Sequence, residues 1–161
     1  MAEALSQKVL ARIDGAKAQY HRLILVAAPS GSGKTEALRQ VAARTGARIV
    51  NLNLELSRRM LDLTERERAL RLPDLLNEVV GTDEPLALLD NVELLFDPAL
   101  RQDPLRLLQG VSRNRTIVAA WNGTLEKGYL TYAAPEHPEH RRYSRDDRGD
   151  VMVVCPDVAS P

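Results

Sequence analysis

Residues 28–35 read Ala-Pro-Ser-Gly-Ser-Gly-Lys-Thr, which matches the phosphate-binding loop pattern G-x-x-x-x-G-K-[ST] except that Ala28 replaces the first glycine. An apolar run of strand length, residues 23–27, comes directly before this segment. Residues 33–45 have the composition of a helix that ends at Gly46. In a strand–loop–helix unit of this kind, glycines let backbone N–H groups curve around an anion at a helix N-terminus. The sequence therefore predicts a phosphate site, and an ordinary Gly-Ser turn is the alternative.

The predicted ligand is ATP with Mg²⁺. Lys34 is expected to reach the β- and γ-phosphates, and the Thr35 hydroxyl to bind the metal ion. The chain has no N-K-x-D motif for reading guanine, which argues against GTP. The residues expected to contact the nucleotide are Ala28, Pro29, Ser30, Gly31, Ser32, Gly33, Lys34, Thr35 and Glu36.

The rest of the chain alternates strand and helix patterns. Residues 47–53 alternate in polarity as a second strand, and further apolar runs of strand length occupy residues 86–90, 116–121 and 151–155. Helical patterns occupy residues 3–19, 55–80 and 103–112, and Pro73 is expected to break the second of these. The polar residues 135–150 are predicted to form a loop. We therefore predict one α/β domain over residues 1–161, a three-layer αβα P-loop NTPase with a mostly parallel five-stranded sheet.

Polar residues follow the third and fourth predicted strands. Asp90 ends the third strand, where a carboxylate would hold Mg²⁺, although a helix or turn cap is the other interpretation. P-loop ATPases with an added strand commonly have glutamate directly after this aspartate; here Asn91 follows, and the nearest carboxylate is Glu93. Glu93 either orients the attacking water or is structural. Asn122 either senses the γ-phosphate or forms an Asn-Gly turn. This arrangement predicts the strand order 5-1-4-3-2 and a catalytic group of Lys34, Asp90, Glu93 and Asn122.

Arg113, Arg141 and Arg142 are candidates for an arginine finger that completes a neighbouring subunit's site, and a solvated, charge-balanced surface is the alternative. The five arginines within residues 57–72 either contact nucleic acid or form a salt-bridged helix surface. Tyr20 and His21 either stack on adenine or pack at the sheet edge. His137 and His140 have an H-x-x-H spacing, but Pro138 between them disfavours a metal site.

The charge balance limits the choice of partners. Because 22 basic residues match 22 acidic ones, no overall positive field draws the 161-residue chain to nucleic acid or to a membrane surface. DNA contact therefore has only weak support. The N-terminal residues are charged and lack the apolar core of a signal peptide, and the single cysteine cannot form an internal disulfide. We expect a cytoplasmic protein without a membrane segment.

Four segments resemble the BrxF family, small P-loop proteins of bacterial BREX phage-defence systems. They are APSGSGKT, LALLDNVELLF, TIVAAWNG and GYLTYAAPEHPEHRRY, and the resemblance runs over about residues 5–155. It implies an ATP-binding component that works with larger BREX proteins, including a methyltransferase and other ATPases. Compared with full AAA+ proteins, the chain stops after the fifth predicted strand, so the helical lid and its second sensor arginine are expected to be absent.

An open site of this kind predicts slow hydrolysis by a lone subunit and completion of the site by a neighbour's arginine. The leading hypothesis is a homo-oligomeric, nucleotide-dependent assembly or switch subunit. Two alternatives remain from the sequence. One is a small-molecule or nucleoside kinase with an arginine-rich lid, and the other is an ATP-binding scaffold that does not hydrolyse its ligand.

Overall fold

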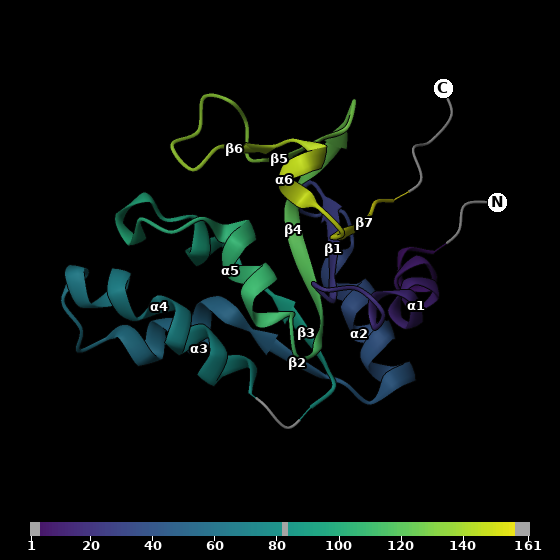
Figure 1. Cartoon of the computed structure of the whole chain (residues 1–161), viewed down its shortest axis with the longest axis horizontal. Helices are drawn as coiled ribbons and strands as arrows, with labels where there is room; N and C mark the ends of the chain where they lie inside the picture. Colours follow the sequence, from purple (N-terminus) through teal and green to yellow (C-terminus); the bar gives the residue numbers. More distant parts are fainter. Residues whose placement is uncertain (1–3, 82–83, 157–161) are drawn as a thin grey trace.

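The computed structural model describes residues 4–81 and 84–156. Five parallel strands form the central sheet in the order β2-β3-β4-β1-β7 (Figure 1). Because β7 is the fifth predicted strand, this order read from the β7 edge is the predicted 5-1-4-3-2. The chain is therefore an α/β protein with the topology expected for a P-loop NTPase. The strands are β1 (Leu23–Ala28), β2 (Arg48–Asn51), β3 (Leu86–Asp90), β4 (Thr116–Glu126) and β7 (Met152–Val154).

Helices cover both faces of this sheet, giving the predicted three layers (Figure 1). Residues alternate between two apolar clusters along each strand: Leu23 and Leu25 of β1 face one cluster, Ile24 and Val26 the other. All of β1 is buried, which is why it reads as a continuous apolar run. One face carries α1 (Leu5–Ala16) and α2 (Lys34–Thr45). The other carries α3 (Leu52–Met60), α4 (Glu65–Val80), α5 (Pro104–Val111) and the 3₁₀ turns η1 (Glu93–Phe96) and η2 (Pro98–Leu100).

Most predicted boundaries differ from the structure by a few residues. The first helix begins at Leu5, and residue 3, where we predicted its start, lies outside the described residues. The second strand ends at Asn51 rather than residue 53, because the Asn51 side chain accepts the Leu54 N–H at 3.2 Å and caps α3.

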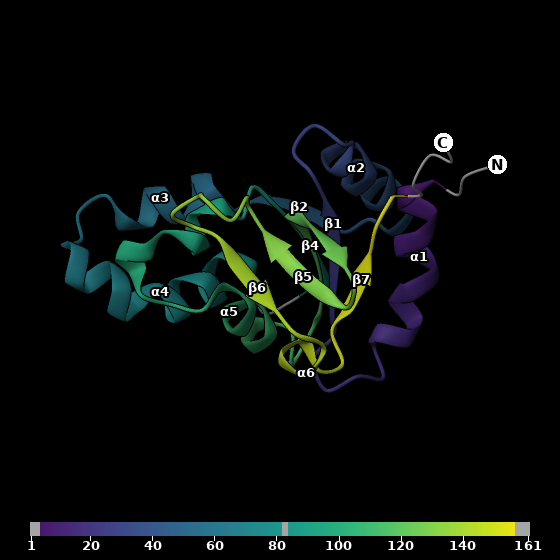
Figure 2. The ribbon, with the colours of Figure 1, turned by 90° about the horizontal axis from the view of Figure 1, so that it is seen from above.

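Within the described residues the sheet has seven strands, two more than predicted. β4 continues past residue 121 to Glu126 and then pairs in antiparallel fashion with β5 (Tyr129–Tyr132), which pairs with β6 (Arg141–Tyr143). Figure 2, which views the molecule from above, shows β5 and β6 crossing the middle of the view in front of the central sheet. Residues 135–150 are therefore not all loop, since they include β6 and the short helix α6 (Arg145–Arg148). Ser144 and Asp147 form a capping box that starts this helix.

Pro73 does not break its helix, contrary to the prediction. The interruption falls earlier, between Met60 and Glu65, where Thr64 and Glu67 form a capping box that starts α4. Pro73 then lies inside α4 and cannot donate to the carbonyl of Ala69, four residues before it. The side-chain amide of Gln102 donates to that carbonyl at 2.8 Å instead. A partner from outside the helix thus compensates for the missing backbone bond.

An aromatic cluster ties the antiparallel extension to the main sheet. The Phe96 and Tyr132 rings stack with centroids 3.4 Å apart, and Trp121 lies edge-on to Phe96 at 5.1 Å. Trp121 also donates its indole N–H to the Thr131 carbonyl at 2.9 Å. Burial raises the pKa of the Tyr132 hydroxyl far above its usual range, and the charge of Glu93 adds to this. The cluster therefore fixes η1, β4 and β5 together beside the predicted site.

Candidate nucleotide site

The predicted phosphate loop connects β1 to α2. Gly31 and Gly33 adopt left-handed backbone conformations, with φ of 80° and 88°. Residues other than glycine pay a steric penalty in this region, so the two glycines allow the chain to curl before α2 begins at Lys34. A loop of this shape directs successive N–H groups into one concavity at the positive end of the helix dipole. The local geometry therefore fits a phosphate.

Lys34 lies across the loop that precedes it. Its ammonium donates to the carbonyls of Ala28 and Pro29, each at 2.8 Å, and only 7% of the residue is exposed. Burial lowers the pKa of Lys34, while the nearby charges of Glu93 and Asp90 act in the opposite direction. A partly desolvated cation in this position favours an incoming anion.

Thr35 and Asp90 come together although 55 residues separate them. The Thr35 hydroxyl donates to Oδ2 of Asp90 at 2.8 Å, and the Asn91 N–H donates to Oδ1 at 3.0 Å. Mg²⁺ is usually bound by one or two protein oxygens, with phosphate oxygens and waters completing its shell. Two oxygen atoms at the edge of the phosphate loop fit that requirement. Elsewhere, no group of three or more His, Cys, Asp or Glu side chains within the described ranges is placed to hold a metal.

Glu93 reaches the same region because the chain turns sharply after Asp90. Asn91 has a positive φ of 54°, which reverses the backbone and brings the η1 turn back over the strand ends. The Asn122 side-chain amide donates to Oε1 of Glu93 at 2.7 Å. Glu93 and Asn122 were both predicted site residues, and the structure places them in direct contact.

Asn53 is a site residue that sequence reasoning missed. Its side-chain amide donates to Oε2 of Glu93 at 3.0 Å, and its side-chain oxygen accepts the Leu94 N–H at 2.8 Å. We had assigned Asn53 to the second strand. The sequence did contain a signal for this contact. Asn53 lies at the carboxyl end of the predicted second strand, and the predicted sheet order places that strand next to the third, which Glu93 follows.

The remaining predicted site residues contact other groups. The Glu36 side chain is 61% exposed and lies 3.5 Å from Arg39. Arg141 donates to the Gln102 carbonyl at 3.3 Å, and the Arg142 guanidinium lies 3.7 Å from the centre of the Tyr129 ring. Because an arginine finger would act on a neighbour's site, these contacts leave that prediction untested.

Tyr20 and Arg113 lie at the opposite edge of the sheet from the phosphate loop. They precede β1 and β4 respectively, and the Arg113 guanidinium lies 4.7 Å from the centre of the Tyr20 ring. His21 contacts Asp150 through both its backbone N–H and its ring. Parallel strands place their starts and their ends at opposite edges, so Tyr20 and His21 cannot stack on a nucleotide in this chain's own loop.

The arginines of α3 and α4 fit the salt-bridged interpretation. Arg58 and Arg59 lie 3.3 and 3.1 Å from Glu55, and Arg68 donates to the Leu63 carbonyl.

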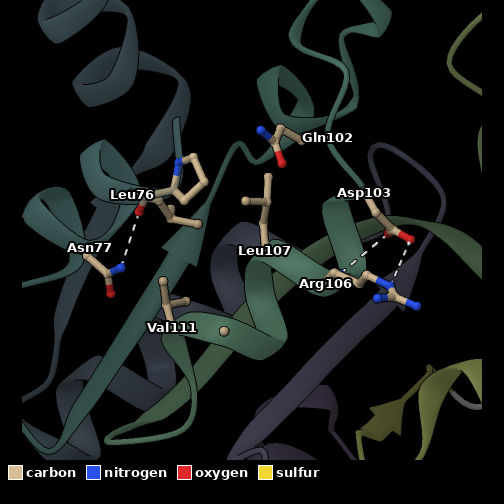
Figure 3. Close-up of a pocket in the computed structure, with 9 residues that line it drawn as sticks. Leu76, Asn77, Gln102, Asp103, Arg106, Leu107 and Val111 are labelled. Carbon is tan, nitrogen blue, oxygen red and sulfur yellow. Dashed lines mark hydrogen bonds and ion pairs between the residues drawn. The ribbon is translucent and has the colours of Figure 1, made fainter. Parts of the chain in front are cut away.

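A groove of 350 Å³ between α4 and α5 is lined by residues that include Leu76, Leu107 and Val111, as Figure 3 shows. None of the predicted site residues lines it.

His137 and His140 each form a hydrogen bond with a backbone group through Nδ1.

Comparison with solved structures finds 16 chains that match, including the two that follow. No family model and no curated protein matches this sequence. The structure of PCH-2 from C. elegans matches 94% of this chain and 40% of its own length, with 20% identity and a TM-score of 0.43. A structure described as the structural basis for katanin self-assembly matches 73% of this chain and 38% of its own length, with 19% identity and a TM-score of 0.35. The chain thus spans well under half the length of either match. The fold assignment rests on strand order.

Within residues 4–81 and 84–156, the structure has no helix long and apolar enough to cross a membrane.

Proposed function

We propose that this chain binds ATP with Mg²⁺ and hydrolyses it slowly, as a nucleotide-dependent assembly or switch subunit. The observation that carries the proposal is the 2.8 Å contact between Thr35 and Asp90. It joins the residue after the loop lysine to the carboxylate at the end of β3, and these are the two positions from which a P-loop NTPase holds its metal ion. An ordinary Gly-Ser turn would not require a carboxylate from a distant strand at that place.

Slow hydrolysis follows from how Glu93 is held. A carboxylate that activates water must be able to turn toward that water and accept its proton. Here each oxygen of Glu93 already accepts an amide N–H, one from Asn53 and one from Asn122. Asn122 is also the predicted γ-phosphate sensor. A phosphate that drew the Asn122 amide toward itself would release Oε1 of Glu93, which links the nucleotide state to the availability of a base.

The proposed assembly role rests on the contacts of two arginines. Arg141 and Arg142 are both engaged away from the chain's own phosphate loop, so charge stabilisation of the transition state would come from a second subunit.

The proposed place in bacterial BREX defence rests on the sequence resemblance alone. Two of its most distinctive strings, residues 90–93 and 121–123, carry Asp90, Glu93 and Asn122 of the candidate site. Other BREX proteins are the proposed partners, together with further copies of this chain.

The test is the mass of the purified protein in solution without nucleotide, with ADP·Mg and with a non-hydrolysable ATP analogue, alongside phosphate release. We expect assembly with the analogue and phosphate release that rises more steeply than protein concentration. Lys34→Ala should abolish nucleotide binding, whereas Lys17→Ala, in an exposed ion pair with Asp14, should not. An unchanged mass and no phosphate release would contradict the switch, and nucleotide binding by Lys34→Ala would contradict the site.

A non-hydrolysing scaffold is the second candidate. The observation that favours it is that amide hydrogen bonds restrain both oxygens of Glu93. Such a protein would bind ATP and assemble, but it would release no phosphate at any protein concentration. The same experiment therefore separates the two functions.

A further inference from the structure

A cavity of 340 Å³ adjoins the phosphate loop on the side away from Asp90 and Glu93. Its floor includes Pro29 and Ser32 of the loop. One wall includes Leu125 near the end of β4, and the other is Cys155 and Pro156, which follow β7. The cavity therefore shares its floor with the phosphate site while its walls come from two other parts of the chain.

The position of this cavity matches the direction in which a bound nucleotide must extend. Asp90 ends β3 and Glu93 follows it. Strand β4 lies between β3 and β1, so the terminal phosphate and its metal ion belong on the β3 side of the loop. Strand β7 lies on the other side of β1, and it is the end of β7 that contributes Cys155. A nucleotide whose γ-phosphate points toward Asp90 would direct its nucleoside toward this cavity.

The chemistry of the lining suits a nucleoside. Most lining side chains are apolar, including those of Pro29, Leu125 and Pro156, and polar side chains such as Ser32 and Thr124 complete the rim. Small-molecule sites typically have volumes of about 300–1,000 Å³, with mainly apolar walls and a few polar groups. A flat heterocyclic base with a ribose is a ligand of this size and polarity.

The antiparallel extension, which we did not predict, supplies the outer wall. Leu125 pairs with Leu130 across the turn between β4 and β5, and the Trp121 indole anchors β5 through the Thr131 carbonyl. Cys155 is fixed on the opposite wall, because its carbonyl accepts the Lys8 ammonium at 2.8 Å. The extension thus has a definite position over the loop, held by the aromatic cluster beneath it.

We propose that this cavity binds the base and ribose of the nucleotide, and that the β4–β5 hairpin is the wall that encloses them. The inference rests on the proposed function, since it assumes that the loop binds the phosphates of a nucleotide. It assigns to the hairpin the enclosure that a separate lid would otherwise give.

Cys155 provides a direct test because it is the chain's single cysteine. The rate of its reaction with methyl methanethiosulfonate is followed by intact mass without ligand, with the Mg²⁺ complex of the β,γ-imido analogue of ATP, and with Mg²⁺ tripolyphosphate. Analogue at 100 times its Kd leaves about 1% of the sites free, so we expect labelling to slow by roughly tenfold or more. Tripolyphosphate, which lacks a nucleoside, should leave the rate unchanged.

Calorimetry on the same samples separates this inference from the proposed function. If the analogue binds and the labelling rate stays the same, the nucleoside lies elsewhere and the inference is wrong, while the proposed function stands. If the analogue produces no binding heat, the proposed function itself fails.

A pair of variants gives an independent reading. Cys155→Phe places a ring in the cavity and should weaken binding of the ATP analogue by roughly tenfold or more while leaving tripolyphosphate affinity unchanged. Ser57→Phe, which places the same ring at an exposed position of α3, should bind both ligands as the parent protein does. Equal analogue affinity in Cys155→Phe and the parent would overturn the inference, as would equal loss of both ligands in a variant that melts normally. If Cys155→Phe does not fold, the labelling experiment on the parent protein decides.

Discussion

The side-chain amide of Asn53 lies 3.0 Å from a carboxylate oxygen of Glu93, although 40 residues separate them in sequence. Asn53 follows β2 and Glu93 follows β3, and these strands are neighbours in the sheet. Asn122 contacts the other oxygen of Glu93 from β4, on the far side of β3. The carboxylate is therefore held between the ends of three adjacent strands. Its orientation depends on the sheet order rather than on any local sequence motif.

Replacing Glu93 with glutamine tests whether it activates water. The amide keeps the size of the side chain but cannot accept a proton, so phosphate release should fall by about 10²-fold or more while nucleotide affinity stays within a few-fold. Steady-state phosphate release and calorimetric binding measure the two quantities. Glu136→Gln, at an exposed position, is the matched control. Undiminished phosphate release in Glu93→Gln would assign Glu93 a structural role.

Removing the Asn53 side-chain amide tests whether its bond restrains Glu93. Asn53→Ala frees one carboxylate oxygen, and one net hydrogen bond contributes about 1 kcal/mol, which corresponds to roughly a fivefold rise in phosphate release. Asn77→Ala is the control, since that amide donates to the Pro73 carbonyl within α4. Slower release from Asn53→Ala would show instead that Asn53 holds Glu93 in its active orientation.

The sequence predicted the strands of the central sheet and the glycine-containing loop between β1 and α2 because both depend on strong local patterns, whereas the strand order came from placing Asp90 on the third strand and Asn122 on the fourth. Residues 23–27 and 86–90 are apolar runs that only a sheet covered on both faces can bury, and the glycines of the loop have a specific backbone purpose. The hairpin was missed because β5 and β6 are three or four residues long and mix tyrosine with polar residues. Asn53 was missed because its partner, Glu93, belongs to a different crossover. The effect of Pro73 was misjudged for a similar reason, since the compensating Gln102 comes from outside the helix.

The Thr35–Asp90 pair predicts a specific loss of Mg²⁺ dependence. Thr35→Val removes the hydroxyl and Asp90→Asn removes the charge, so ATP affinity in each variant should no longer improve when Mg²⁺ replaces EDTA. Thr35→Ser keeps the hydroxyl and should retain the improvement. Calorimetric titration of ATP in both buffers measures the ratio. An unchanged ratio in Asp90→Asn would remove Asp90 from the metal site.

Gly123 should be intolerant of any side chain. A Cβ at this position would lie 1.7 Å from the Thr131 carbonyl oxygen, and that oxygen belongs to the paired strand β5. Gly123→Ala must therefore separate β4 from β5, and we expect the free energy of unfolding to fall by about 2 kcal/mol or more. Urea denaturation measures the change. Gly110→Ala in α5 is the control, since a Cβ there meets nothing within 4 Å and should stabilise the helix by about 0.5–1 kcal/mol. A similar effect in the two variants would contradict the close approach at Gly123.

Gln102 should matter for stability only because Pro73 is present. Gln102→Ala leaves the Ala69 carbonyl without a protein donor, which should lower the free energy of unfolding by about 1 kcal/mol. In a Pro73→Ala background, the new N–H of residue 73 can donate to Ala69 within the helix, so the same Gln102→Ala change should cost much less. Urea denaturation of the parent, both single variants and the double variant gives the coupling free energy between the two sites. A coupling near zero would mean that Gln102 does not compensate for the proline, and that α4 tolerates Pro73 for another reason.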